Sequence, residues 1–179
     1  MATQQPAKLD QGTAYGRGPQ SHEALTTEVG PGTPCGEFMR RYWQPAVAEK
    51  LAGLPLAVRF LGEDLVLFRD KTGRPGLVHA RRCHRGTTLY YGRVEEHGIR
   101  CCYHGWLFDV EGNCLDMPCE KDNGAGIREN VRQPWYPVIE EYGLIWAYFG
   151  PPEKKPALIR WSTLENVGPG EKLYAHQGT

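Results

Sequence analysis

Two short segments that combine cysteine with histidine constrain this chain more than any other feature of its sequence. The first is Cys83-His84-Arg85-Gly86 and the second is Cys101-Cys102-Tyr103-His104-Gly105-Trp106, with 16 residues between His84 and Cys101. Thiolate and imidazole ligands together suit zinc, copper or iron–sulfur centres. A glycine close after each histidine allows a tight loop around a compact metal centre. We therefore expect a fold that brings two metal-binding loops together.

The composition argues against several classes of protein. The 179 residues contain 40% hydrophobic residues, which is enough for one domain with a core. Lys plus Arg and Asp plus Glu both number 21, and this balance argues against a nucleic-acid binder. The sequence has no apolar run of membrane-spanning length and no secretory signal. Six cysteines without an export signal predict metal or redox chemistry in a reducing compartment, and hence a cytoplasmic location.

The pattern of hydrophobic residues predicts a fold built from about seven short strands. They are expected at 56–60, 65–68, 77–80, 99–101, 106–108, 138–140 and 144–149. Turn residues separate them, notably Leu61-Gly62-Glu63-Asp64 and Tyr142-Gly143. Strands at roughly 8–12-residue spacing are typical of an all-β sandwich or small barrel.

One short helix is predicted before the strands. Thr33 is suited to an N-cap and Pro34 to the first helical position. Phe38, Met39, Tyr42 and Trp43 fall at helical spacing, and Pro45 is expected to end the helix. Tyr42 and Trp43 are expected to face the core.

The two loops and their flanks resemble a known family. The matching residues are His84-Arg85-Gly86, Cys101-x-x-His104, Tyr103 and Gly105-Trp106-x-Phe108-Asp109, with outlying matches at 41–45, 61–66 and 143–146. They resemble the Rieske [2Fe–2S] domain of the oxygenase (alpha) component of ring-hydroxylating, phthalate-dioxygenase-like oxygenases. The resemblance covers roughly residues 28–155. It implies an all-β, Rieske-type antiparallel sandwich or small barrel with two cluster-binding loops and a short N-terminal helix.

The resemblance also implies roles for individual residues. In such centres two cysteines hold one iron and two histidines hold the other, which raises the reduction potential. The metal ligands implied here are Cys83, His84, Cys101 and His104. Residues implied to surround the ligands are Arg85, Tyr103, Gly105 and Trp106. For Tyr103, a hydrogen bond to a cluster sulfur and simple aromatic packing are both open, whereas Cys102 is expected to be a small packing residue.

Residue 82 departs from the family pattern. The pattern Cys-x-His places a cysteine two residues before His84, where this chain has Arg82. One interpretation is a one-residue slip of the loop that makes Cys83 the ligand. The other is a lost ligand, which would leave a redox-inactive or zinc-binding structural module with the Rieske fold.

The implied function is electron transfer. Such a domain takes electrons from a flavin or ferredoxin-type reductase and passes them to a mononuclear Fe(II) site, usually in a neighbouring subunit of a homotrimer. That site is held by two histidines and a carboxylate, and after His104 this chain has only His176. We therefore expect an N-terminal tail at 1–32, a Rieske domain at 33–155, and a linker or the start of a catalytic domain at 156–179. The resemblance implies an aromatic acid or aryl ether as substrate of the whole oxygenase.

Overall fold

The structure is a computed structural model that describes residues 23–48, 53–81 and 86–171. Within these ranges, eleven short strands form three antiparallel sheets, and the helices are few and short. The prediction of an all-β antiparallel fold is therefore confirmed. No helix in the described ranges is long and apolar enough to cross a membrane.

The central sheet has the strand order β2-β3-β4-β9. Its strands are β2 (Leu56–Phe60), β3 (Glu63–Arg69), β4 (Pro75–His79) and β9 (Trp135–Tyr136). The predicted β2–β3 turn is confirmed, because Leu61 and Gly62 both adopt positive φ values, 45° and 81°. A turn with two residues at positive φ matches the twist of the two strands that it joins.

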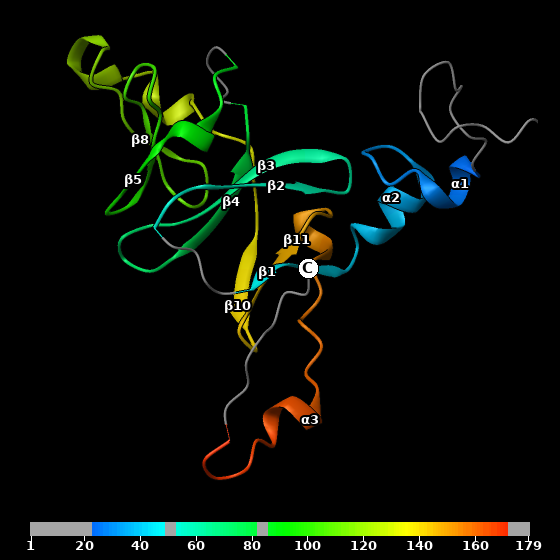
Figure 1. Cartoon of the computed structure of the whole chain (residues 1–179). Helices are drawn as coiled ribbons and strands as arrows, with labels where there is room; N and C mark the ends of the chain where they lie inside the picture. The colour runs from blue at the N-terminus through cyan, green and yellow to red at the C-terminus, as the bar shows by residue number, and fades with distance from the viewer. Residues whose placement is uncertain (1–22, 49–52, 82–85, 172–179) are drawn as a thin grey trace, which may run out of the picture.

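Strand β3 is buried on both faces, and this places the central sheet between two cores. Leu65 and Leu67 pack with Leu77 and Ile145 on one face. Val66 and Phe68 point to the opposite face, because side chains alternate along a strand. There they join a larger core, whose other buried members are Val78, Leu89, Val94, Ile99, Cys101, Trp106, Phe108, Cys114 and Met117. Figure 1 shows the central sheet between the other two.

The second sheet, with order β5-β6-β7-β8, lies against the larger core. Its strands are β5 (Arg93–Glu95), β6 (Gly98–Arg100), β7 (Leu107–Phe108) and β8 (Cys114–Asp116). A short 3-10 helix, η1 (Leu89–Tyr91), precedes β5. The second predicted metal loop, at 101–106, connects β6 to β7, so this sheet carries it.

The third sheet, with order β1-β11-β10, lies against the smaller core. Its strands are β1 (Trp43–Ala48), β10 (Val138–Glu141) and β11 (Leu144–Tyr148). The predicted hairpin around Tyr142 and Gly143 is confirmed, since both have positive φ values, 57° and 72°. In Figure 1 this sheet lies away from the green β5–β8 sheet.

The predicted helix begins as expected but ends early. Helix α2 spans Pro34–Met39, and the Thr33 side chain caps it by accepting from the N–H of Gly36. The prediction that Tyr42 and Trp43 continue the helix is wrong, because β1 begins at Trp43. Pro45 lies inside β1, next to a register shift on this edge strand, where proline is tolerated. Tyr42 is exposed, so the prediction that it faces the core is also wrong.

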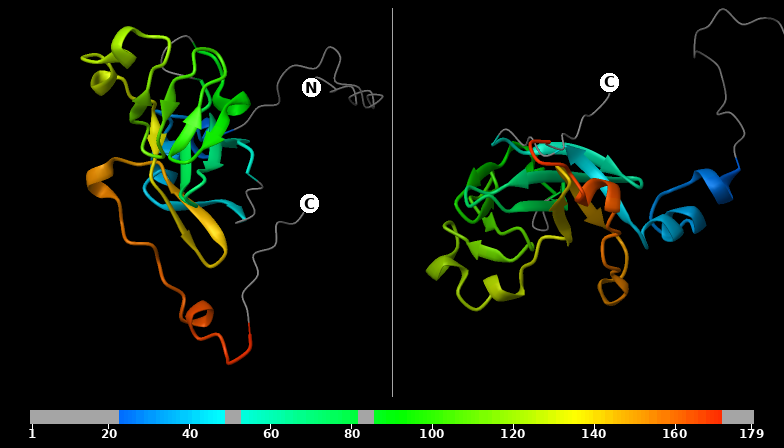
Figure 2. Two further views of the ribbon diagram at one scale, coloured as in Figure 1. Left: turned by 90° about the vertical axis from the view of Figure 1, so that its left-hand side faces the viewer. Right: turned by 90° about the horizontal axis from the view of Figure 1, so that it is seen from below.

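The remaining elements are single turns. They are helices α1 (Ala24–Thr27) and α3 (Ser162–Glu165), and 3-10 helices η2 (Lys121–Gly124), η3 (Arg128–Asn130) and η4 (Pro152–Lys154). Figure 2 shows α3 at the end of a long segment that follows η4, and Glu165 of α3 accepts from the Tyr142 hydroxyl at the β10–β11 turn at 3.1 Å. The described helices therefore contribute little to the two cores.

Candidate metal centre

The loop at 101–106 is closed by its own backbone. The N–H of Cys101 donates to the carbonyl of Trp106 at 2.9 Å, and the N–H of Gly105 donates to the carbonyl of Cys101 at 3.1 Å. Gly105 has a φ of +72°, and a Cβ at this position would lie 2.9 Å from Cγ of Pro118. The glycine is therefore required both by the turn and by the close approach of Pro118.

The two adjacent cysteines of this loop have opposite environments. Cys101 is 1% exposed and belongs to the larger core, whereas Cys102 is exposed to solvent. Adjacent side chains on an extended segment point to opposite sides, which separates the two thiols. Cys101 is therefore the inward-facing thiol of this loop. The prediction that Cys102 is a packing residue is wrong.

His104 and Tyr103 lie together near the surface of the loop. Their ring centroids are 4.1 Å apart, and Tyr103 is 55% exposed while His104 is half-buried. Tyr103 is therefore not a packed core aromatic, unlike Trp106, which is buried in the larger core. An imidazole at this depth combines access to a metal with access to solvent.

The first predicted loop lies largely outside the described residues. Arg82, Cys83, His84 and Arg85 all fall in the gap at 82–85. Its described ends are joined, because Arg81 forms an isolated bridge with Thr88 and the N–H of Leu89 donates to the carbonyl of Ala80 at 2.8 Å. The chain therefore leaves the central sheet and returns to it at one place.

An ion-pair network joins the second loop to strands β5, β6 and β8. The Arg100 guanidinium donates to Glu95 at 2.7 Å, to Asp116 at 2.5 Å and to the carbonyl of Gly105. Arg93 also donates to Glu95, at 3.0 Å. The hydrogen bond from Arg100, helped by Arg93, lowers the pKa of Glu95 to about 2. This network fixes the direction in which the loop leaves β6.

A second polar cluster holds the end of β4. The buried Glu63 carboxylate accepts from Arg40 at 2.5 Å and from the Tyr136 hydroxyl at 2.6 Å, and it lies 2.9 Å from Nε2 of His79. Burial, followed by the hydrogen bond to Glu63, raises the pKa of Tyr136. No sequence pattern indicated this cluster, because its members are far apart in the chain and form no motif.

The donor set available in the described ranges fits half of a [2Fe–2S] site. One buried thiol, Cys101, and one half-buried imidazole, His104, lie on a single tight loop. Within those ranges no group of three or more potential ligands is close enough to hold a metal. The other two predicted ligands, Cys83 and His84, lie in the segment at 82–85, outside the described residues.

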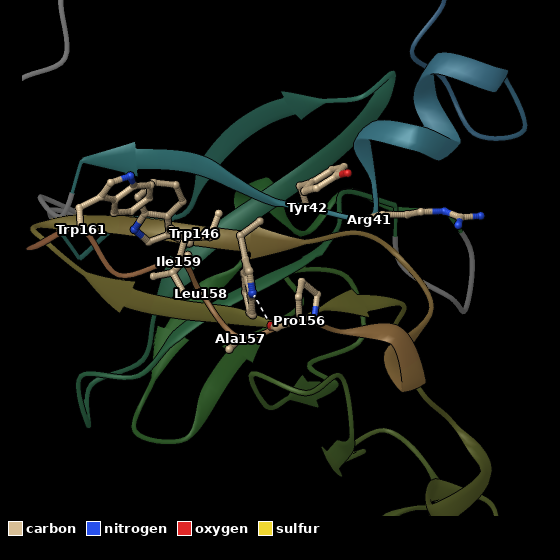
Figure 3. Close-up of a pocket in the computed structure, with 9 residues that line it drawn as sticks. Arg41, Tyr42, Trp146, Pro156, Ala157, Leu158, Ile159 and Trp161 are labelled. Atoms are coloured by element: carbon tan, nitrogen blue, oxygen red, sulfur yellow. Dashed lines mark hydrogen bonds between the residues drawn. The ribbon is translucent and has the colours of Figure 1, made fainter.

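The structure also contains an apolar cavity away from these loops. It measures about 280 Å³ and lies between β1, β11 and the segment at 156–161 (Figure 3). The ring centroids of Trp146 and Trp161 are 5.6 Å apart, and Nε1 of Trp43 donates to the carbonyl of Pro156 at 2.8 Å. The residues that line it include none of the predicted metal ligands.

Three antiparallel sheets with a Cys-x-x-His loop between two strands define a small all-β domain with a candidate metal loop. Residues 42–139 match the family described as the Rieske [2Fe–2S] domain. The chain belongs to this family, and its relatives are oxygenase subunits.

Comparisons with individual proteins agree with this assignment. The chain is 59% identical over 168 residues to phenoxybenzoate dioxygenase subunit alpha of Ectopseudomonas oleovorans, covering 93% of this chain and 41% of that protein. It is 38% identical to the phthalate 4,5-dioxygenase oxygenase subunit of Pseudomonas putida, covering 80% of this chain and 34% of that protein. A crystal structure of dicamba monooxygenase superposes with a TM-score of 0.64 at 26% identity, covering 74% of this chain and 44% of that one. The chain thus spans less than half the length of these relatives.

Proposed function

We propose that this chain is the electron-transfer module of a Rieske oxygenase. The observation that carries the proposal is the loop at 101–106, where a buried Cys101 and a half-buried His104 have the spacing of the family. A [2Fe–2S] cluster with mixed cysteine and histidine ligands supplies reversible one-electron transfer. We propose Cys83, His84, Cys101 and His104 as its ligands.

The protein's own groups have distinct tasks in this proposal. Cys101 provides a thiolate from the core side, and His104 provides an imidazole on the solvent side. A histidine at that depth offers a short path for an electron to a docked partner and a site for a coupled proton. Arg100 holds the loop by its bonds to Glu95, Asp116 and the carbonyl of Gly105.

The relatives suggest the setting in which the module acts. We propose that it receives electrons from a flavin or ferredoxin-type reductase and passes them to a mononuclear Fe(II) site in a catalytic domain, within a homotrimer. In this scheme residues 33–155 are the Rieske domain and 156–179 connect it to the catalytic domain. The names of the relatives, which include phenoxybenzoate and phthalate dioxygenase subunits, favour an aromatic acid or aryl ether as substrate. All five cysteines of the described ranges are free thiols, which favours a reducing compartment, and we propose the cytoplasm.

A second candidate function follows from Arg82. Because this residue stands where the family pattern has its first cysteine, a Cys/His set including Cys83, His84, Cys101 and His104 would hold one zinc ion instead. The domain would then be a structural module without redox activity.

The deciding experiment is metal analysis of the complete chain after anaerobic reconstitution with iron and sulfide. Iron, sulfide and zinc are measured per chain, and an EPR spectrum is recorded after reduction with dithionite. We expect two irons and two sulfides per chain and a reduced [2Fe–2S] signal. Zinc in place of iron, or no metal, would contradict the electron-transfer function.

Arg82→Cys provides the matched comparison, since it restores the family spacing. If Cys83 is the ligand, the wild type and Arg82→Cys both bind the cluster and Cys83→Ser loses it. If only Arg82→Cys binds iron, the wild-type chain is the structural module.

A further inference from the structure

One carbonyl at the end of β4 lacks the donor that the neighbouring strand would normally provide. Strand β4 pairs with β9 as far as Val78 and Trp135, and the next pair in this register is His79 with Pro134. The N–H of His79 donates to the carbonyl of Pro134 at 2.9 Å. Proline has no N–H, so the reciprocal bond to the carbonyl of His79 cannot form.

The side chain of Gln133 supplies this donor. Its Nε2 donates to the carbonyl of His79 at 2.8 Å and to the carbonyl of Arg81 at 2.9 Å. Gln133 is 0% exposed, so the donor of both bonds is fully buried, although the acceptor residues are only partly covered. An amide nitrogen has two hydrogens, and both carbonyls lie on the same edge of an extended segment. The side chain thus continues the β4–β9 ladder by two residues.

This place in the fold is the entrance to the first predicted metal loop. Arg81 is the last described residue before 82–85, which contains Cys83 and His84. On the other edge, the N–H of Ala80 donates to the carbonyl of Asp64 at 3.0 Å. The segment at 79–81 is therefore held from both sides just before the loop.

The backbone of Gln133 contacts the hairpin that carries the second loop. Its N–H donates to the carbonyl of Gly112 at 2.7 Å. Gly112 belongs to the turn between β7 and β8, and β7 directly follows the loop at 101–106. A Cβ on Gly112 would lie 2.0 Å from the carbonyl oxygen of Gln133, so the two segments touch. One residue thus contacts the entrance of the first loop and the hairpin of the second.

We propose that Gln133 is a positioning residue for the cluster: it fixes the segment at 79–81, which leads into the first predicted metal loop, relative to the hairpin that carries the second loop. This inference rests on the proposed function, because it assumes that the two loops together hold the [2Fe–2S] cluster. Its bonds to the carbonyls of His79, Arg81 and Gly112 are the contacts through which we infer that it acts. Losing its amide leaves the carbonyls of His79 and Arg81 without this buried donor and loosens the segment at 79–81.

The test compares Gln133→Met, which removes the donor at similar volume, with Ile145→Val in the smaller core. The rate of iron release to a chelator is measured for each reconstituted chain. Residues that orient metal ligands typically change metal affinity by 10- to 100-fold, so Gln133→Met is expected to release iron about 10- to 100-fold faster. Ile145→Val is expected to release iron at the wild-type rate. Equal rates for Gln133→Met and the wild type would overturn the proposal, as would equal acceleration by both variants.

A compensating change separates positioning from general loss of stability. Pro134→Ala restores a backbone N–H opposite His79, so Gln133→Met/Pro134→Ala is expected to recover part of the lost retention. A double variant that releases iron as fast as Gln133→Met would contradict the proposed ladder. Should Gln133→Met not fold, Gln133→Asn shortens the amide by one methylene and carries the same prediction.

Amide hydrogen exchange tests the inference on the chain without a bound cluster. Gln133→Met is expected to speed exchange at the N–H groups of Ala80 and Leu89, but not in β11. Unchanged exchange at these two amides would overturn the inference. A wild-type chain that binds no iron would instead contradict the proposed function, and the exchange result would still stand.

Discussion

The carboxylate of Glu63 and the imidazole of His79 lie 2.9 Å apart at the end of the central sheet, between β3 and β4. Glu63 is 9% exposed, and its other oxygen accepts from Arg40 of the segment that follows α2. The Glu63 carboxylate thus links Arg40 of the N-terminal segment to His79 of β4, the strand that leads into the first predicted metal loop. Burial of the Glu63 charge is costly unless these partners compensate it.

Arg40→Leu is expected to lower the free energy of unfolding by about 3–5 kcal/mol. Removing the guanidinium leaves Glu63 buried without its cation, which is the costly way to break a buried ion pair. Arg59→Leu is the matched control, because Arg59 pairs with the adjacent Asp64 while both side chains are about 70% exposed. An exposed pair contributes at most about 1 kcal/mol. Equal losses for the two variants in urea unfolding would contradict this account.

Gly112→Ala is expected to destabilise the protein more than Gly73→Ala. Both glycines have positive φ values, which cost an alanine about 1–2 kcal/mol. Only at Gly112 would the added Cβ meet another backbone, 2.0 Å from the carbonyl oxygen of Gln133, whereas nothing lies within 4 Å at Gly73. Overpacking adds about 1–3 kcal/mol. Thermal unfolding of the two variants measures the difference, and indistinguishable midpoints would count against the contact with Gln133.

Glu95 is expected to make stability depend on pH in acid. Its pKa falls from 4.5 to about 2 on folding, mainly through the hydrogen bond from Arg100. The unfolded chain therefore binds the proton first, so this contribution is complete above about pH 4.5 and is lost as the pH falls toward about 2. The stability gap between wild type and Glu95→Gln is expected to shrink between pH 5 and pH 2.

The exposed Glu129 provides the control for this effect. Urea unfolding of wild type, Glu95→Gln and Glu129→Gln is measured across the same pH range. The gap for Glu95→Gln is expected to change more over this range than the gap for Glu129→Gln. A gap for Glu95→Gln that widens as the pH falls would show that the sign is wrong.

Cys101→Ser and Cys102→Ser are expected to have opposite outcomes. Cys101 is 1% exposed and faces the core, whereas Cys102 faces solvent. After reconstitution, Cys101→Ser is expected to retain little or no cluster, while Cys102→Ser keeps the iron content of the wild type. Iron analysis and visible absorption measure both. Loss of the cluster in Cys102→Ser but not in Cys101→Ser would contradict this account, because it would show that Cys102 is the ligand.

Local patterns predicted much of this fold. Continuous apolar runs located β3 and β11, and the turns at Gly62 and Gly143 located the hairpins, because these signals are contained in a few adjacent residues. The loop at 101–106 was found for the same reason. Strand β1 was missed because Pro45 indicates a helix end, although an edge strand with a register shift accommodates it.

The supporting contacts had no such signal. Gln133 bonds to residues more than fifty positions earlier in the chain, and Arg40 to Glu63 across 23 positions. Only the paired sheets bring these groups together. Pro134 was the one available clue, since a proline opposite a strand end leaves a carbonyl for another donor.

The reduction potential of the reconstituted chain tests the central claim most directly. A [2Fe–2S] cluster with two histidine ligands has a potential between about −150 and +300 mV, whereas four cysteine ligands give about −400 mV. A redox titration of the complete chain is expected to give a one-electron midpoint within the higher range. A midpoint near −400 mV, or no reducible centre at all, would contradict the claim that His104 and Cys101 share a Rieske cluster with the first loop.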